Sequence, residues 1–297
     1  MRRNAAFSLV IVALLASSQS KADENRPAAA DLAYGAYQRG EYKLAMSEAQ
    51  KRLAADPKDG SAQLLVGRLY AEGAGAPRDV KKAMEWFRRA ADTGNAEGAY
   101  LLGAALLAQE PGVKERAEAR IYLEKAAAQH NAAALNLLGE MALDNNGVVP
   151  DFVAAERYFR QAAEADDTDA KFALGELYRH GKGVAKDDAE AARWFRAAAN
   201  DGHAGAMVEF AIMQFNGTGV TRDPPAAAAL FRRAATMGNA VAQNRLAYLL
   251  AEGRGVEKNL GEAVEWRDKA RATGLVDPRL DQLLSDLSAA TTSASPH

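Results

Sequence analysis

Few residues in the sequence are of types that could carry out covalent, acid-base or metal chemistry. The chain has no cysteine and four histidines, which are His130, His180, His203 and His297. No two of these histidines have the spacing that places a pair of metal ligands on one helical face. Glycine pairs such as Gly253 and Gly255 lack the Lys-Ser/Thr pair of a phosphate-binding loop, and the sequence contains no common hydrolase motif. We therefore expect no enzyme, no metal site and no cofactor.

Composition narrows the kinds of partner that the chain can have. Hydrophobic residues make up 48% of the 297 residues, which is enough apolar surface for a folded protein. The 37 Lys and Arg residues are balanced by 39 Asp and Glu residues, for a formal net charge of −2 at pH 7. Nucleic acids and anionic membrane surfaces require clustered positive charge, so we expect neither as a partner. Because cysteine is absent, disulfides are excluded and packing alone must stabilise the fold.

The first 22 residues have the pattern of a secretory signal. Arg2 and Arg3 form a positive start, residues 5–16 form an apolar run, and the small residues around Ala22 are typical of a cleavage site. The apolar run is shorter than the roughly 20 residues that span a bilayer. We predict a signal peptide over residues 1–22 and a mature protein that is exported without membrane insertion, to the periplasm or, alternatively, to the medium. A retained signal anchor is a further alternative.

The elements that position the remaining side chains follow from a repeat of 36 residues. Stepping by 36 from Ala83 and from Ala90 meets an alanine every time, as far as Ala263 and Ala270. A column of mostly aromatic residues lies between these alanines and consists of Trp86, Tyr122, Tyr158, Trp194, Leu230 and Trp266. Such a period, sustained over most of a chain, indicates a solenoid of stacked helical repeats.

Each repeat has the pattern of two short antiparallel helices. In the fourth copy, Ala191, Trp194 and Ala198 lie on one face of the second helix. We expect Trp194 and its column to fill the core beside these alanines and beside Gly175 of the first helix. The large ring would then use the space that the small residues leave free.

The link between the two helices contains glycines and a signal for the start of a helix. Gly181 and Gly183 can adopt the positive φ values that most residues avoid. Asp187 follows at the N-cap position, where a side-chain oxygen can accept hydrogen bonds from free amides. The same position holds Asp79, Glu115, Asp151, Asp223 and Asn259 in the other copies.

The run from Ala170 to Gly202 resembles the Sel-one-like repeat, a relative of the tetratricopeptide repeat. The resemblance covers six repeats over residues 60–275, and residues 23–59 resemble a single tetratricopeptide motif that would cap the N-terminal end. It implies an all-α fold, a right-handed α-solenoid of antiparallel helix pairs. Leucines with helical spacing predict a C-terminal capping helix over residues 276–290, and residues 291–297 are expected to be a disordered tail.

The resemblance also implies a function in protein-protein interaction. Relatives act as adaptors in signalling or assembly, which implies a protein or peptide partner in the cell envelope. Two alternatives stay open. Some secreted relatives are described as weak β-lactam-binding hydrolases, which would imply an envelope hydrolase or small-ligand binder, although those relatives are rich in cysteine and this chain has none. The other alternative is a secreted effector directed at a host cell.

A row of residues on the first helices lies outside the predicted core and forms the candidate binding groove. If Ala170 and Leu174 face the second helix, then Phe172, Glu176 and Arg179 face the inner concave wall of the solenoid. The candidate groove residues are Leu64, Arg68, Tyr100, Asn136, Glu140, Phe172, Glu176, Arg179, Val208, Ile212, Asn244 and Tyr248. Aromatic and aliphatic residues on a surface are typical of a groove for an extended or helical peptide. The alternative is that these residues fill contacts between adjacent repeats.

Overall fold

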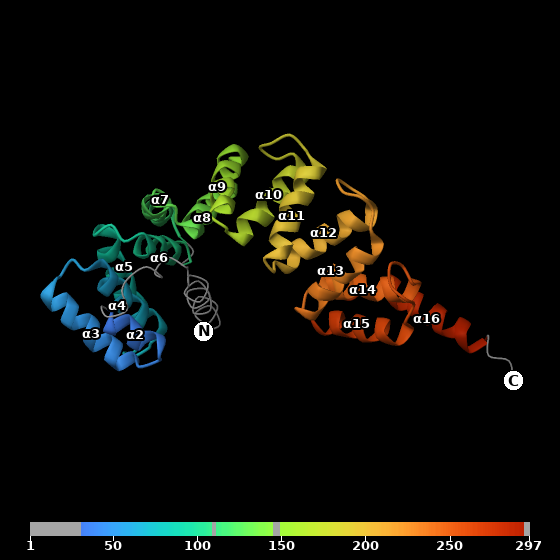
Figure 1. The fold of residues 1–297 in the computed structure, drawn as a ribbon, viewed down its shortest axis with the longest axis horizontal. Helices are drawn as coiled ribbons and strands as arrows, with labels where there is room; N and C mark the ends of the chain where they lie inside the picture. Colours follow the sequence, from blue (N-terminus) through green and yellow to red (C-terminus); the bar gives the residue numbers. More distant parts are fainter. Residues whose placement is uncertain (1–30, 109–110, 145–148, 294–297) are drawn as a thin grey trace. The chain divides into compact units, whose positions relative to one another are not determined.

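The fold is built from helices throughout the part of the chain that the structure describes (Figure 1). This structure is a computed structural model, and it describes residues 31–108, 111–144 and 149–293. These residues contain no strand. The prediction of an all-α solenoid of helix pairs is thus confirmed. The predicted signal peptide, residues 1–22, lies outside the described residues, as does the end of the predicted tail, residues 294–297.

The first of two compact units ends at Met141. Consecutive helices pack on one another within it, and Ala33, Ala36 and Ala45 from the first two helices are buried against Leu65 and Leu69 of the third. The helices are α2 (Leu32–Gln38), α3 (Tyr42–Ala55), α4 (Gly60–Glu72), α5 (Val80–Asp92), α6 (Ala96–Leu107) and α7 (Val113–Ala127). The boundary between the units falls inside α8 (Ala132–Leu143).

The second unit begins at Ala142 and repeats the same arrangement. Each helix packs on its neighbours in the chain, and one continuous apolar core runs from Ala191 to Leu284. The helices are α9 (Phe152–Glu164), α10 (Thr168–His180), α11 (Asp188–Asn200), α12 (Ala204–Asn216), α13 (Pro224–Thr236), α14 (Ala240–Glu252), α15 (Leu260–Ala272) and α16 (Pro278–Ser293). No helix in the described part of the chain combines the length and the apolar character needed to cross a bilayer.

Side chains at the helix starts explain where the second helix of each repeat begins. The predicted N-cap Asp187 accepts hydrogen bonds from the amides of Ala189 and Glu190 at 2.9 and 3.0 Å. The prediction is also confirmed at Asp79, Asp151, Asp223 and Asn259. It is wrong for Glu115, because Gly112 opens α7 and places Glu115 inside the first helical turn.

The core residue beside Gly175 is Phe195, which corrects the prediction made for Trp194. The Phe195 side chain is fully buried, whereas Trp194 is half-buried. A Cβ atom built on Gly175 would lie 2.5 Å from Cε1 of Phe195, so α10 has to carry a glycine for the ring to fit. Residues i+3 and i+4 both lie near one helical face, and the rotation of α11 decides which of them enters the core. The buried column is Phe87, Leu123, Phe159, Phe195 and Phe231, and Trp266 is buried in the last repeat.

The loop glycine Gly183 allows adjacent repeats to approach closely. Its φ is +76°, and a Cβ atom built on it would collide with the backbone carbonyl of Phe152, at the start of α9 in the preceding repeat. A larger residue would therefore be excluded twice, by its backbone conformation and by contact. The prediction of positive φ at Gly181 and Gly183 is confirmed.

The turn that joins one repeat to the next also needs a residue with positive φ. Glycine supplies it at residues 94, 202, 238 and 274. His130 and Asp166 occupy the same position in two repeats, with φ values of 58° and 69°. These two residues adopt a left-handed conformation that costs an ordinary residue about 1 to 2 kcal/mol.

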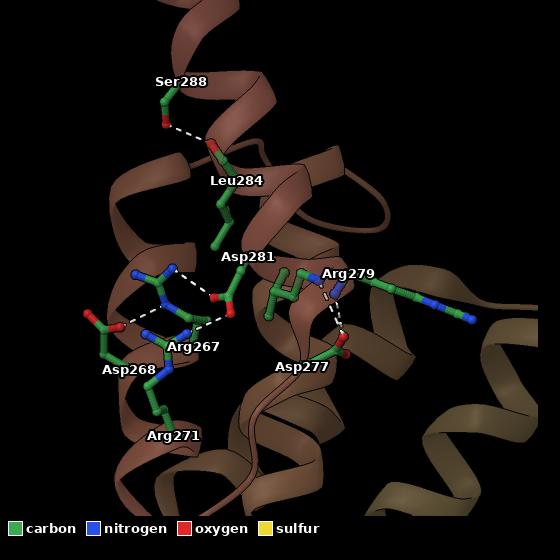
Figure 2. A network of polar contacts seen from close by, with 9 residues as sticks. Arg267, Asp268, Arg271, Asp277, Arg279, Asp281, Leu284 and Ser288 are labelled. Carbon is green, nitrogen blue, oxygen red and sulfur yellow. Dashed lines mark hydrogen bonds and ion pairs between the residues drawn. The ribbon is translucent and has the colours of Figure 1, made fainter.

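The last helix, α16, closes the apolar end of the second unit. Leu280 and Leu284 are buried in the core of that unit. Arg267 and Arg271 of α15 reach Asp281 of α16, with Nη1 of Arg267 at 3.1 Å and Nη2 of Arg271 at 2.6 Å from its oxygens (Figure 2). Apolar burial and these ion pairs hold α16 against α15.

Candidate functional site

Two adjoining hollows flank α14 in the second unit, and together we call them the α14 groove. The first, about 370 Å³, lies between α12 and α14 and is lined by Ile212, Phe215, Asn216, Phe231, Arg245, Tyr248, Leu249, Glu252 and Arg254. The second, about 550 Å³, lies between α14 and the start of α16 and is lined by Val241, Asn244, Arg245, Tyr248, Leu275, Asp277, Pro278 and Arg279. Arg245 and Tyr248 line both hollows, so the groove crosses α14 at these two residues.

The first hollow exists where an ion pair of the preceding repeat is replaced. Arg179 of α10 pairs with Glu209 of α12. One repeat later, 36 residues on, the corresponding residues are Phe215 and Arg245. A phenylalanine cannot pair with an arginine as a carboxylate does, so the two side chains leave the space between α12 and α14 open. In the preceding repeat the arginine, Arg179, lies on the earlier of the two helices, α10, whereas Arg245 lies on the later of the two, α14.

The floor of the first hollow is apolar. Phe231 and Leu249 are buried, and Ile212 and Phe215 are half-buried beside them. The guanidinium of Arg254 lies 4.6 Å from the centre of the Phe215 ring, and its Nη1 is 3.2 Å from Oε2 of Glu252. A cation over the ring face stabilises this orientation of Phe215. The hollow thus offers an apolar surface, and the charge of Arg254 at its edge is already paired with that of Glu252.

The second hollow is organised around Asp277. Its Oδ2 accepts hydrogen bonds from Nδ2 of Asn244 at 2.9 Å and from the hydroxyl of Tyr248 at 3.2 Å. Its Oδ1 accepts from the amides of Arg279 and Leu280 at 3.1 and 3.3 Å, and so caps α16. The hydrogen bond from Asn244 holds the pKa of Asp277 below its ordinary value. Burial, together with the charge of Asp277, raises the pKa of the Tyr248 hydroxyl, which therefore stays protonated and donates.

Two arginines of the groove have no direct ion-pair partner in the described part of the chain. The side chains of Arg245 and Arg279 are exposed, and neither forms an ion pair or side-chain hydrogen bond with any other residue in the described ranges. Both act on the pKa of Tyr248 by lowering it, which places both charges near that hydroxyl. In Figure 2 the guanidinium of Arg279 extends away from the polar network at the start of α16. The two exposed cations therefore lie near the Tyr248 hydroxyl.

Three of the predicted groove residues line the α14 groove, and they are Ile212, Asn244 and Tyr248. The other predicted residues of the second unit lie elsewhere in packing contacts. The Phe172 ring stacks on His203 with ring centres 4.4 Å apart, and Val208 is buried. Arg179 pairs with Glu209, and Oε2 of Glu176 lies 3.3 Å from Nε2 of His180.

The predicted groove residues of the first unit are mostly enclosed. Tyr100, Asn136 and Arg68 are 2%, 8% and 7% exposed. Nη2 of Arg68 lies 3.0 Å from Oε1 of Glu97, and Leu64 is half-buried. Glu140 is exposed and accepts a hydrogen bond from Asn136 at 3.4 Å. Some members of the predicted row are therefore buried or make contacts within the solenoid, and others line the α14 groove.

The sequence analysis did not single out Phe215, Arg245, Arg254 or Arg279. A signal was available for the first two. Phe215 lies 36 residues after the candidate Arg179, and Arg245 directly follows the candidate Asn244. No periodic signal marks Arg254, which lies in a loop, or Arg279, which lies beyond the last repeat.

The lining of the groove has the composition of a binding surface. The described residues that line its two hollows include no histidine, cysteine, serine or lysine. No cluster of three potential ligands for a metal ion occurs in residues 31–108, 111–144 and 149–293. An apolar floor beside two free cations is instead the composition of a recognition site.

Comparison with known proteins gives six matches to one repeat family. The Sel1 repeat matches residues 60–95, 96–131, 132–167, 168–203, 204–239 and 240–272. The chain resembles the crystal structure of a protective antigen from uropathogenic Escherichia coli, at 31% identity and a TM-score of 0.73 over 82% of this chain. It spans about half of that antigen, 52%. It also resembles a Sel1 repeat protein from Oxalobacter formigenes, at 28% identity and a TM-score of 0.69, over 80% of this chain and 94% of that one. No protein of curated function matches the chain.

Proposed function

Because this chain belongs to the Sel1 repeat family, we propose that it is a protein-protein interaction scaffold of the cell envelope that holds a peptide segment of its partner in the α14 groove. Sel1 repeat proteins are generally protein-protein interaction scaffolds and are generally not enzymes. The observation that carries the proposal for this chain is the groove itself, with its apolar floor and its shared residues Arg245 and Tyr248.

The groove has the features that a peptide site requires. The apolar residues of its first hollow come from α12, α13 and α14, which are fixed by the core of the second unit, so this surface is preformed. Preformed sites bind more tightly because less conformational freedom is lost on binding. Tyr248 and Asn244 are already oriented by Asp277, so they present defined hydrogen-bonding groups at the rim.

The envelope setting is supported by the sequence of residues 1–22 alone. Cell fractionation followed by N-terminal sequencing of the mature protein tests it. We expect a soluble periplasmic protein whose first residue lies near Asp23. A chain that starts at Met1 and sediments with membranes would contradict export and would leave the groove as a site for a cytoplasmic or membrane-bound partner.

Site-specific photocrosslinking in intact cells tests the groove. A photoreactive phenylalanine analogue is introduced in place of Val241, which lines the groove and is 44% exposed. The matched control places it at Val153 of α9, an exposed valine of the same unit that is 68% exposed and lies outside the groove. We expect a crosslinked partner from residue 241 that is absent from residue 153. The same adducts from both residues, or none from residue 241, would refute the proposed site.

A further inference from the structure

The chemistry of the partner can be read from the difference between two successive repeats, and this step rests on the proposed function of the α14 groove. Between α10 and α12, the chain supplies its own carboxylate, Glu209, to the cation Arg179. Between α12 and α14, the equivalent cation position is Phe215 and the equivalent carboxylate position is Arg245. The charge at the second position is thus reversed, and no residue in the described part of the chain forms an ion pair with it.

The carboxylates already present in the groove form no ion pair with these arginines. Glu252 pairs with Arg254 at 3.2 Å. Both oxygens of Asp277 accept hydrogen bonds from within the chain. These donors are neutral, so Asp277 keeps its negative charge, and the second hollow carries the two positive charges of Arg245 and Arg279 against this single negative one. An anionic group on the ligand would complement them, and a cationic group would be repelled.

The neighbouring hollow selects for a second feature of the ligand. Ile212, Phe215 and Leu249 form an apolar surface directly beside Arg245. A bulky apolar side chain placed there would displace water from this surface, which is the main source of binding free energy at interface centres. The two hollows share Arg245 and Tyr248, so both groups of the ligand must lie close together.

We infer that the partner of the α14 groove is a peptide segment in which an aspartate or glutamate lies next to a bulky apolar residue. The apolar side chain occupies the hollow between α12 and α14. The carboxylate pairs with Arg245 and takes the role that Glu209 has in the preceding repeat, with Arg279 as a second cation. Arginine suits this role because its planar guanidinium can bind a carboxylate through two hydrogen bonds.

Selection from a random library of phage-displayed heptapeptides tests this inference without knowledge of the natural partner. The full chain and its Arg245→Glu variant are panned in parallel. The wild-type chain should enrich peptides in which Asp or Glu adjoins an aromatic or large aliphatic residue. Arg245→Glu should lose the acidic preference and gain a preference for Lys or Arg at the same position, because the charge of the site is inverted. Arg196→Glu serves as the control, since Arg196 is exposed on α11 outside the groove.

Affinities for a synthetic peptide from the wild-type selection complete the test. Fluorescence anisotropy should show at least a tenfold loss of affinity for Arg245→Glu, less than about a twofold change for Arg196→Glu, and weaker binding at high salt. Thermal melts of both variants check that each is folded, as expected for exposed residues. Peptides without acidic preference, the same peptides on wild type and Arg245→Glu, or no enrichment at all would each overturn the inference.

The two proposals can fail separately. If photocrosslinking at residue 241 captures a partner while the selected peptides show no acidic preference, the groove is a binding site and only the inferred partner chemistry is wrong. If neither crosslinking nor selection finds a ligand, the proposed function of the groove is wrong as well.

Discussion

Replacement of Phe195 by alanine should destabilise the second unit far more than replacement of its neighbour Trp194. The Phe195 side chain of α11 is fully buried in the core of the second unit, beside α10. It fills the space over Gly175 and lies near Phe172, with ring centres 5.6 Å apart. Both residues are large aromatics on the same helix, so Trp194→Ala is a matched control for Phe195→Ala.

The expected magnitude follows from what surrounds the ring. Phe→Ala in a core costs about 3 to 5 kcal/mol, from lost burial and from the cavity that remains. Gly175 has no side chain that could move into this cavity, so we expect a value in the upper half, about 4 to 5 kcal/mol. Trp194 is half-buried and has the guanidinium of Arg193 5.6 Å from the centre of its ring. Its truncation should cost about 1 to 2 kcal/mol, since part of its surface stays in water.

Urea denaturation of the full chain, followed by circular dichroism, measures both losses. Because each repeat contacts only its neighbours, Phe195→Ala should split the transition or lower its first midpoint, as the second unit unfolds before the first. A loss for Trp194→Ala equal to or greater than that for Phe195→Ala would refute the assignment of the core column. So would a Phe195→Ala protein that unfolds at the same midpoint as wild type.

Three further predictions concern the ends of helices. His203 caps α12, because its Nδ1 accepts a hydrogen bond from the amide of Ala206 at 2.9 Å. In urea melts at neutral pH, His203→Ala should lower the free energy of unfolding by about 1 kcal/mol, whereas His203→Asn should change it little. Equal losses for the two variants would exclude the cap as the cause. His130→Gly should raise the free energy of unfolding by about 1 kcal/mol, because φ is +58° at this residue and glycine adopts that value without strain; an unchanged or lower urea midpoint would contradict this. The pKa of Asp277 is held below its ordinary value by Asn244. The ionised carboxylate therefore stabilises the fold above about pH 4, and this contribution is lost as the pH falls further. Between pH 6 and pH 3 the urea midpoint should fall less steeply for Asn244→Ala than for wild type, and parallel curves would contradict the prediction.

Local signals in the sequence were sufficient for the repeats and for most helix starts. The alanine columns have a period of 36 residues, and a cap such as Asp187 bonds to amides only two and three residues away. Such interactions depend on residues that are near in sequence, so their pattern can be recognised without the fold. Glu115 was misplaced because the start of α7 is shifted relative to the other second helices, to Gly112.

The choice between Trp194 and Phe195 as core residue needed the tertiary structure. Both residues lie on the side of α11 that carries Ala191 and Ala198, and a helix has no integral number of residues per turn. The close approach of α10, permitted by Gly175, sets the rotation of α11 and brings Phe195 to the interface. The aromatic column read from the sequence was therefore one residue away from the buried column, at Trp194 in place of Phe195.

The sequence by itself determined the family, the helix pairs and the order of the repeats, because each of these depends on a pattern that recurs along the chain. Only the tertiary structure decided which members of the predicted row are accessible. Tyr100 and Val208 are covered by their neighbours, whereas Ile212 and Tyr248 line a groove. That groove arises from a departure from the repeat, where Phe215 and Arg245 replace the ion pair of Arg179 and Glu209. Phe215 and Arg245 are 30 residues apart in the sequence and line one hollow only because α12 and α14 stack. The sequence alone therefore does not show that these two replacements form a groove.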